Sequence, residues 1–195
     1  MSKKAALDEL VTEIQQRAQN RNRFTIALSG FGGAGKSTVV NTLAESLGDV
    51  AIIHLDDFIV DRLSARSSDW DGFDWDRLTR QLLEPLSSGA QEIEYDVYNW
   101  PADKITETRK VVVPKFVILE GIGLVRDSLK KYFDVTIWLD VPLEVASERG
   151  KRRDVVTNGV PLHAELWDTL WTPNDRDYFE KYQPKENADY LLENE

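Results

Sequence analysis

The residues with the clearest chemistry form one octapeptide, at positions 30–37. It reads Gly-Phe-Gly-Gly-Ala-Gly-Lys-Ser and fits the pattern G-x-x-x-x-G-K-[ST]. Glycines let backbone N–H groups turn toward phosphate oxygens without a side-chain clash. Lys36 can reach the β- and γ-phosphates, and the Ser37 hydroxyl can ligate Mg²⁺. The sequence therefore predicts a triphosphate site formed by Gly30, Phe31, Gly32, Gly33, Ala34, Gly35, Lys36, Ser37 and Thr38.

The segments on either side of this octapeptide are those that a phosphate-binding loop requires. Residues 24–29 alternate apolar with small or polar side chains, as a strand does. Residues 37–47 repeat apolar side chains at helical spacing. The N-terminus of that helix would direct the positive end of its dipole at the phosphates. We therefore interpret residues 30–37 as a phosphate-binding loop and not as an incidental glycine-rich turn.

Acidic residues follow two further predicted strands. Asp56 and Asp57 come after the strand at 50–55, and Glu120 comes after the strand at 116–119. Ligands of such sheets bind at the carboxyl ends of the strands, so these acids should converge on the phosphate loop. Phosphoryl transfer to a hydroxyl needs Mg²⁺ and a carboxylate that accepts the hydroxyl proton. We predict that Asp56 is this base and that Glu120 organises Mg²⁺, directly or through water.

A cationic run spans residues 149–153, on a helix predicted from about residue 142. Most charge runs are solvated helix faces, which is the simpler interpretation. Arg149 and Arg153 are four apart, however, and so share one helical face. As a lid they would neutralise charge on the transferred phosphoryl group and exclude water. We favour the lid, over about residues 142–160, with Arg149 and Arg153 as catalytic cations.

Strands and helices alternate along the chain, which indicates a parallel sheet with right-handed crossovers. We predict a single α/β domain over residues 1–195: a P-loop NTPase fold with about five strands, flanking helices and a lid helix. Acceptor-binding insertions are expected at about 56–74 and 92–113, and a mobile loop at 61–72. Further elements are predicted at 5–18 (helix), 74–88 (helix capped by Asp74), 135–139 (strand), 163–183 (helical in part, broken by Pro173) and 188–192 (strand).

Composition excludes several classes of protein. The net charge is −10 and the basic residues form no tail, so nucleic acid is a poor candidate partner. The sequence contains no stretch of about 18 apolar residues, so no membrane span is predicted. The chain has no cysteine, which excludes disulfides and thiolate metal sites. The N-terminus does not resemble a signal peptide, so we expect a cytoplasmic enzyme. Its oligomeric state stays open, a homo-oligomer included.

Six segments, in this order and spacing, resemble the uridine kinase-like family of P-loop small-molecule kinases, with nicotinamide riboside kinase, pantothenate kinase and phosphoribulokinase as relatives. The resemblance extends over about residues 24–192. The segments are the loop at 30–37, H-L-D-D-F at 54–58, D-G-F-D at 71–74, Y-N-W at 98–100, L-E-G-I at 119–122 and the arginine-rich lid at 149–154.

This resemblance implies roles for individual residues. Asp56 matches the general base of the family, Asp71 the carboxylate that contacts ribose hydroxyls, and Tyr98 the ring that faces the nucleobase. Trp100 lies in the same segment as Tyr98 and is a further candidate for the acceptor. The implied activity is transfer of the γ-phosphoryl group of ATP, with Mg²⁺, to a primary hydroxyl of uridine or a related nucleoside.

Departures from the family pattern cluster where the acceptor should bind. Ile59 replaces a Tyr, Asn99 replaces an Asp, and Asp103 and Lys104 stand where a His and an Arg are usual. Ala146 replaces the first lid arginine. Two alternatives therefore stay open: a kinase of a sugar, nicotinamide riboside or a pantothenate-like acid, and a nucleotide-dependent regulatory NTPase. A switch GTPase is expected to carry N-K-x-D, which this sequence lacks.

The remaining aromatic and histidine residues have weaker claims to function. We expect Trp75 and Trp138 in the core, and Trp167 and Trp171, four apart, to pack along one helix face. His54 lies beside the predicted base and is expected to support the site without taking part in catalysis.

Overall fold

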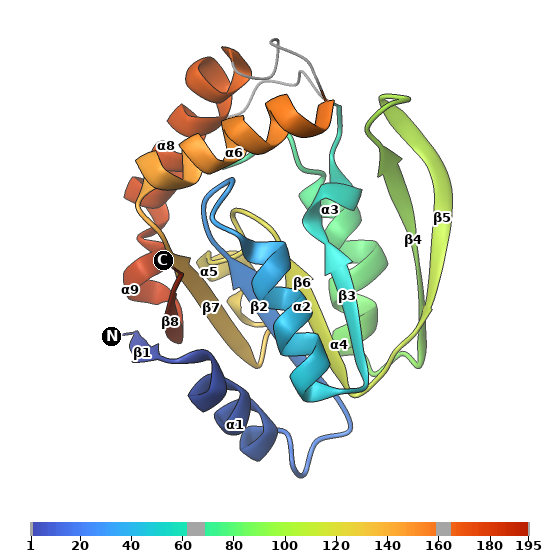
Figure 1. Cartoon of the computed structure of the whole chain (residues 1–195). Helices are drawn as coiled ribbons and strands as arrows, with labels where there is room; N and C mark the ends of the chain where they lie inside the picture. Colours follow the sequence, from blue (N-terminus) through green and yellow to red (C-terminus); the bar gives the residue numbers. More distant parts are fainter. Residues whose placement is uncertain (1, 62–68, 159–164, 195) are drawn as a thin grey trace.

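A parallel sheet of six strands forms the centre of the molecule (Figure 1). The computed structural model describes residues 2–61, 69–158 and 165–194. In spatial order the strands are β1 (Lys3–Ala5), β8 (Tyr190–Glu193), β7 (Val135–Asp140), β2 (Phe24–Ser29), β6 (Phe116–Glu120) and β3 (Val50–His54).

The register of the sheet sets where the chemistry gathers. Strand β2 lies between β7 and β6, and its Leu28 is opposite Glu120. Glu120 is in turn opposite His54 of β3. These central strands are almost continuously apolar, as strands buried on both faces must be. The phosphate loop therefore leaves the middle of the sheet beside the carboxyl ends of β6 and β3.

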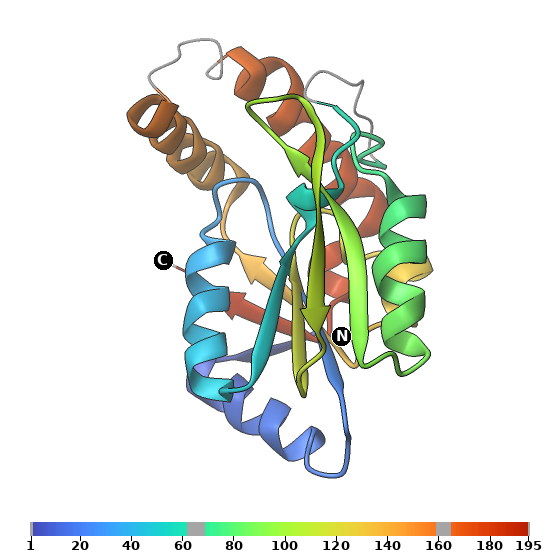
Figure 2. The ribbon, with the colours of Figure 1, turned by 90° about the vertical axis from the view of Figure 1, so that its right-hand side faces the viewer.

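Helices cover both faces of this sheet. Figure 2 shows α1 and α2 on one face and the helical stretch at 75–87 on the other. The bounds are α1 (Leu7–Arg17), α2 (Lys36–Leu47), η1 (Leu55–Phe58), α3 (Trp75–Leu78), η2 (Thr79–Leu83), α4 (Glu84–Ser87), α5 (Asp127–Lys130), α6 (Leu143–Asn158), η3 (Trp167–Trp171), α8 (Thr172–Tyr182) and α9 (Pro184–Asn187). None of the helices in the described ranges is long and apolar enough to cross a membrane.

An antiparallel hairpin, β4 (Glu92–Asn99) and β5 (Lys104–Val112), stands apart from the main sheet (Figure 1). It packs on η1, where the ring of Tyr95 stacks on Phe58 with centroids 5.3 Å apart. Arg77 of α3 connects η1 to the hairpin, because its buried guanidinium donates to the carbonyl oxygens of Asp57 on η1 and Asp96 on β4, at 3.1 and 2.6 Å. The hairpin therefore helps to fix the segment that carries Asp56.

The prediction of a parallel α/β sheet of about five strands is confirmed, while one predicted helix break is wrong. Among the described residues the sheet has six strands, the sixth being β1, which pairs with β8 at the edge and is too short, at three residues, to show an alternating pattern. Pro173 does not break its helix, since η3 runs directly into α8. Its π-helical turn accommodates the ring and missing N–H of the proline, as η2 does before Pro85.

Several predicted segments lie partly outside the described residues, among them the insertion at 56–74 and the helical segment at 163–183, whose first two residues are not described. The mobile loop predicted at 61–72 includes residues 62–68, which are not described, and the predicted lid ends beyond Asn158, where α6 ends. The helix predicted from Asp74 is confirmed at its start, where the Asp74 carboxylate accepts a hydrogen bond from the Arg77 amide at 2.8 Å.

Candidate active site

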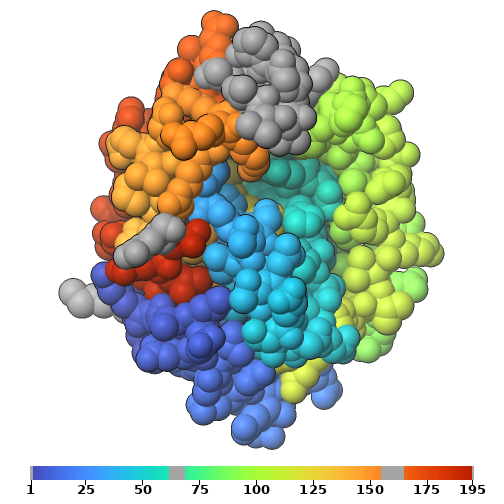
Figure 3. Space-filling view, in the orientation of Figure 1, coloured from blue at the N-terminus to red at the C-terminus, as the bar shows by residue number. Residues whose placement is uncertain are grey.

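A cavity of about 690 Å³ opens at the carboxyl edge of the sheet. Figure 3 shows this face hollowed between α6, in orange, and the blue and cyan segment around α2. The phosphate loop and the start of α2 form its floor, through Gly32, Gly33, Gly35, Lys36, Ser37 and Thr38. Of the other predicted loop residues, Phe31 packs edge-on against Trp138, and Gly30 and Ala34 are not among the lining residues.

The backbone of the loop needs its glycines. Gly33 and Gly35 have φ angles of 79° and 93°, in the left-handed region that favours glycine. A Cβ atom at Gly33 would lie 2.1 Å from the carbonyl oxygen of Ala146, so α6 crosses directly over the loop. Lys36 folds back across the loop, and its Nζ donates to the carbonyl oxygens of Gly30 and Phe31 at 3.1 and 3.0 Å.

Ser37 and Glu120, the predicted magnesium residues, are hydrogen-bonded to each other. The Ser37 hydroxyl donates to Glu120 Oε1 at 3.2 Å, and His54 Nδ1 lies 2.7 Å from the same oxygen. Glu120 is 8% exposed. Burial, the largest single influence, would raise the pKa of Glu120, but the His54 hydrogen bond and the Lys36 charge outweigh it and lower the pKa. The carboxyl group therefore stays ionised at neutral pH.

This pair provides two oxygen donors of the kind that Mg²⁺ prefers. Within the described part of the chain, no three acidic or histidine side chains form a closed metal cage. A sparse protein donor set fits Mg²⁺, which usually completes its octahedron with water and substrate phosphates. His54 contacts this pair through Glu120, and the hydrogen bond between them raises the pKa of the imidazole.

The two adjacent carboxylates on η1 have different surroundings. Asp56 is exposed and lines the cavity. Asp57 instead accepts a hydrogen bond from Arg109 of β5 at 2.9 Å, and Arg109 also donates to the Tyr95 hydroxyl at 3.3 Å. Burial raises the pKa of Asp57 although Arg109 opposes this shift. The geometry thus favours Asp56 over Asp57 as the base.

Both predicted lid arginines line the cavity. Arg149 and Arg153 lie on α6, four residues apart, and Arg153 Nε donates to Asp154 Oδ1 at 3.0 Å. Because α6 crosses over Gly33, these guanidinium groups border the same cavity as the phosphate loop.

The predicted acceptor residues separate in the structure. Trp100 lines the cavity, but Asp71 and Tyr98 are not among its described lining residues. Tyr98 is 4% exposed, and its hydroxyl donates to Asp103. The rings of Tyr98 and Trp100 pack edge-on with centroids 5.6 Å apart, so Tyr98 supports the residue that lines the cavity.

The remaining wall lies partly in segments that the sequence singles out, through Ile59, Phe73, Ile122 and Asp154, whereas Trp70, Trp167, Trp171 and Asp175 were not predicted as site residues. Ile59, Trp70, Phe73 and Ile122 form an apolar surface, and Trp167, Trp171, Asp154 and Asp175 border the cavity beside the lid. Trp70 directly precedes the D-G-F-D segment, a position that could have drawn attention to it. No pattern in the sequence distinguishes Trp167 and Trp171 from tryptophans that only pack a helix face.

The fold, with a P-loop sequence pattern, an acidic pair beside the loop and arginines over it, is the arrangement expected of a P-loop phosphotransferase. The model of the "Phosphoribulokinase / Uridine kinase family" matches residues 25–182, and the chain belongs to this family. It is therefore a kinase.

Relatives and solved structures agree with this assignment. A uridine kinase of Halobacterium salinarum is 31% identical over 182 residues, which cover 87% of this chain and 79% of that one. A candidate fructose transport system kinase from Silicibacter has the same fold, with a TM-score of 0.78 at 24% identity over 95% of this chain and 98% of that one. A candidate uridine kinase from Bacillus stearothermophilus follows, with a TM-score of 0.72 at 22% identity over 95% and 96%.

Proposed function

We propose that this kinase transfers the γ-phosphoryl group of ATP to a primary hydroxyl of uridine or a related nucleoside. The observation that carries the proposal is that one cavity is lined both by the predicted transfer residues and by aromatic rings. The transfer residues are Lys36, Ser37, Asp56, Glu120, Arg149 and Arg153. The aromatic wall of Trp70, Phe73 and Trp100 suits a flat base. The likeness to a uridine kinase supports the same acceptor.

Each residue of the site has a separate task in this transfer. Asp56 accepts the proton of the acceptor hydroxyl. The hydroxyl oxygen bonds to the γ-phosphorus while the bond between the γ-phosphorus and the β–γ bridging oxygen breaks, which releases ADP. Lys36 and the loop amides hold the phosphates, while Arg149 and Arg153 neutralise charge on the moving group. Mg²⁺, held through Ser37 and Glu120, would supply positive charge to the β- and γ-phosphate oxygens.

A second candidate is a kinase of a sugar or a pantothenate-like acid. It is favoured by the position of Asp71 and Tyr98, which the described cavity lining does not include. The fold likeness to a candidate fructose transport system kinase is compatible with it. Asp71 and Tyr98 nevertheless remain predicted nucleoside ligands, because the segments in which they lie resemble the acceptor-binding segments of the family.

One screen separates these candidates. ADP release from MgATP would be measured with uridine, cytidine, deoxyuridine, fructose, glycerate and pantothenate as acceptors. We expect release with the ribonucleosides and a weaker response to deoxyuridine. Release with a sugar or an acid alone would overturn the nucleoside proposal and leave the kinase assignment unchanged. Release that no acceptor stimulates would favour the regulatory NTPase.

The lid arginines should affect transfer and not stability. We expect Arg149→Ala and Arg153→Ala each to lower kcat roughly 10–10³-fold, because their charges act on the transition state. The melting temperature should hardly change, since exposed substitutions usually alter stability by only ~0.5 kcal/mol. Turnover and melting temperature are measured on each variant. Unchanged turnover in both would identify the run as a solvated helix face.

Trp100 should matter for the acceptor and not for ATP. Trp100→Leu removes the aromatic surface from the cavity wall, and base–aromatic stacking contributes ~1–3 kcal/mol. We therefore expect the KM for uridine to rise about 5–100-fold while the KM for ATP stays the same. Equal increases in both KM values would mean that the substitution disturbs the whole cavity.

A further inference from the structure

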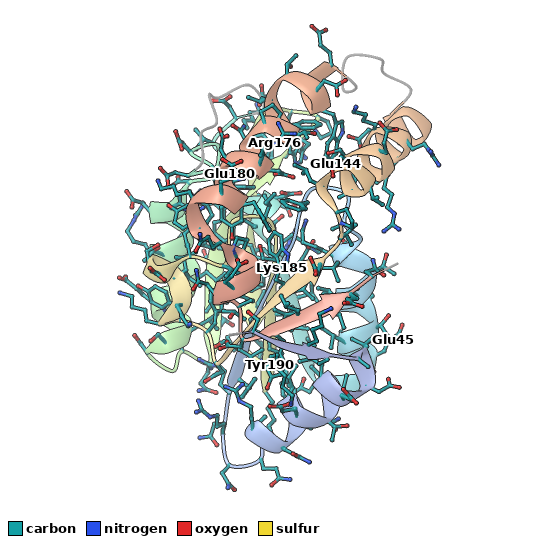
Figure 4. All side chains as sticks on the ribbon, turned by 90° about the vertical axis from the view of Figure 1, so that its left-hand side faces the viewer. Glu45, Glu144, Arg176, Glu180, Lys185 and Tyr190 are labelled. Atoms are coloured by element: carbon teal, nitrogen blue, oxygen red, sulfur yellow. The ribbon has the colours of Figure 1, made fainter. Side chains whose placement is uncertain are left out.

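The lid helix α6 is attached along one face to the continuous helical stretch of η3 and α8, residues 167–182, which we call the C-terminal helix. Figure 4 shows α6 and α8 side by side, with Glu144 labelled on α6 and Arg176 on α8. The fastening positions on α6 follow one another by four and three residues and so share a helical face. The contacts are Ser147 Oγ to Thr172 Oγ1 at 2.9 Å, Lys151 Nζ to Asp168 Oδ1 at 2.6 Å, and Trp167 Nε1 to Asp154 Oδ2 at 2.9 Å.

Trp167 also touches the phosphate loop. Its indole lies between two glycines: a Cβ atom would come within 2.8 Å of the ring at Gly32 and within 2.3 Å at Gly150. Any side chain at either position would collide with the ring, so glycine permits this close approach on both sides. Trp167 is 3% exposed, and the two backbones hold the plane of its indole.

A second contact from the same helical stretch reaches the same glycine. Asp175 Oδ2 accepts a hydrogen bond from the Gly32 N–H at 2.9 Å, and Asp175 is 1% exposed. Asp175 is eight residues after Trp167, about two helical turns, so both side chains lie on one face of the stretch. The C-terminal helix is therefore attached to the phosphate loop at Gly32 by two side chains.

Asp154 extends this attachment to a lid arginine. Its Oδ2 accepts from Trp167 and its Oδ1 accepts from Arg153 Nε at 3.0 Å. The carboxylate is buried, with the residue 7% exposed. A buried carboxylate that holds two donors fixes the relative positions of both. A continuous series of contacts thus connects Gly32, Trp167, Asp154 and Arg153.

We propose that Trp167 is a positioning residue for phosphoryl transfer: through Asp154 it sets the Arg153 guanidinium relative to the phosphate loop. The inference rests on the proposed role of Arg153 at the transferred phosphoryl group. The indole N–H is aimed by the two glycines, the N–H orients Asp154, and Asp154 orients Arg153. Trp167 contacts no reacting atom itself.

A double-mutant cycle tests the proposal. Trp167→Phe keeps an aromatic ring but removes the N–H and the distal indole atoms that lie on Gly32. We expect kcat to fall at least about tenfold, the scale of one lost hydrogen bond to a charged group. Combined with Arg153→Ala, the same substitution should cost nothing more, because the group it positions is gone. Asp154→Asn, which cannot accept from both donors, should reproduce the loss and its dependence on Arg153.

ADP release from MgATP is measured with the acceptor that gives the highest turnover in the screen, and without acceptor. Calorimetry with a non-hydrolysable ATP analogue supplies the second readout, and Trp167→Phe should change its Kd by no more than about twofold. Lys151→Met is the matched control. It removes another contact between the same helices, outside the series from Gly32 to Arg153, and should leave kcat unchanged.

The outcomes separate this inference from the proposed function. If Trp167→Phe lowers kcat equally in the presence and absence of the Arg153 side chain, the positioning role is overturned while the proposed role of the lid arginines stands. An unchanged kcat in both Trp167→Phe and Asp154→Asn would have the same meaning. If Trp167→Phe does not fold, the Asp154→Asn cycle decides by the same criterion. Full activity of Arg153→Ala would contradict the role of Arg153 and, with it, this inference.

Discussion

Lys36→Ala is expected to abolish measurable phosphoryl transfer. The Lys36 ammonium lies across the loop on the carbonyl oxygens of Gly30 and Phe31, at the position where β- and γ-phosphates would bind. The other basic residues of the described cavity lining, Arg149 and Arg153, come from the lid and not from the loop. Loss of one preorganised charge contact typically costs ~10²–10³ in rate. ADP release and the Kd for an ATP analogue measure the effect.

Lys110→Ala is the matched control for this charge change. Lys110 is an exposed lysine of the β4–β5 hairpin that pairs with Glu94 at 2.9 Å, away from the cavity. Its loss should leave turnover as it is. Near wild-type turnover in a folded Lys36→Ala variant would contradict the assignment of the triphosphate site.

Asp56→Asn should lower turnover by roughly 10²–10⁴, the usual contribution of general acid–base catalysis. The amide keeps the size of the side chain but cannot accept the hydroxyl proton. The affinity for ATP should change little, because in the proposed site Asp56 faces the acceptor. Single-turnover measurements with MgATP and the best acceptor separate this chemical step from product release.

Asp57→Asn is the control that the structure supplies. Asp57 is held by Arg109, so its substitution should weaken the attachment of the hairpin and destabilise the protein by about 1–2 kcal/mol, without a comparable loss of kcat. Thermal unfolding and turnover are compared for the two variants. If Asp57→Asn loses activity while Asp56→Asn keeps it, the assignment within the pair is reversed.

Features formed by contiguous residues could be predicted from the sequence. The phosphate loop combines a strand, a glycine turn and a helix within residues 24–47, so the whole motif can be recognised in one short stretch of sequence. The shared face of Arg149 and Arg153 follows from helical periodicity alone. The convergence of Ser37 with Glu120 follows from the rule that parallel strands end at one edge, and their 3.2 Å hydrogen bond agrees with it.

Only the tertiary structure decided which neighbours these residues have. The sequence favours Asp56 over Asp57 through the family resemblance, and the structure adds a physical difference, because Arg109, 52 residues after Asp57, binds Asp57. Gly32 and Asp175 are 143 residues apart, and their hydrogen bond depends on how the C-terminal helix packs. Periodicity indicates which side of a helix is apolar but not what that side meets. Trp167 was therefore expected to pack, and its contact with the phosphate loop is a result of the fold.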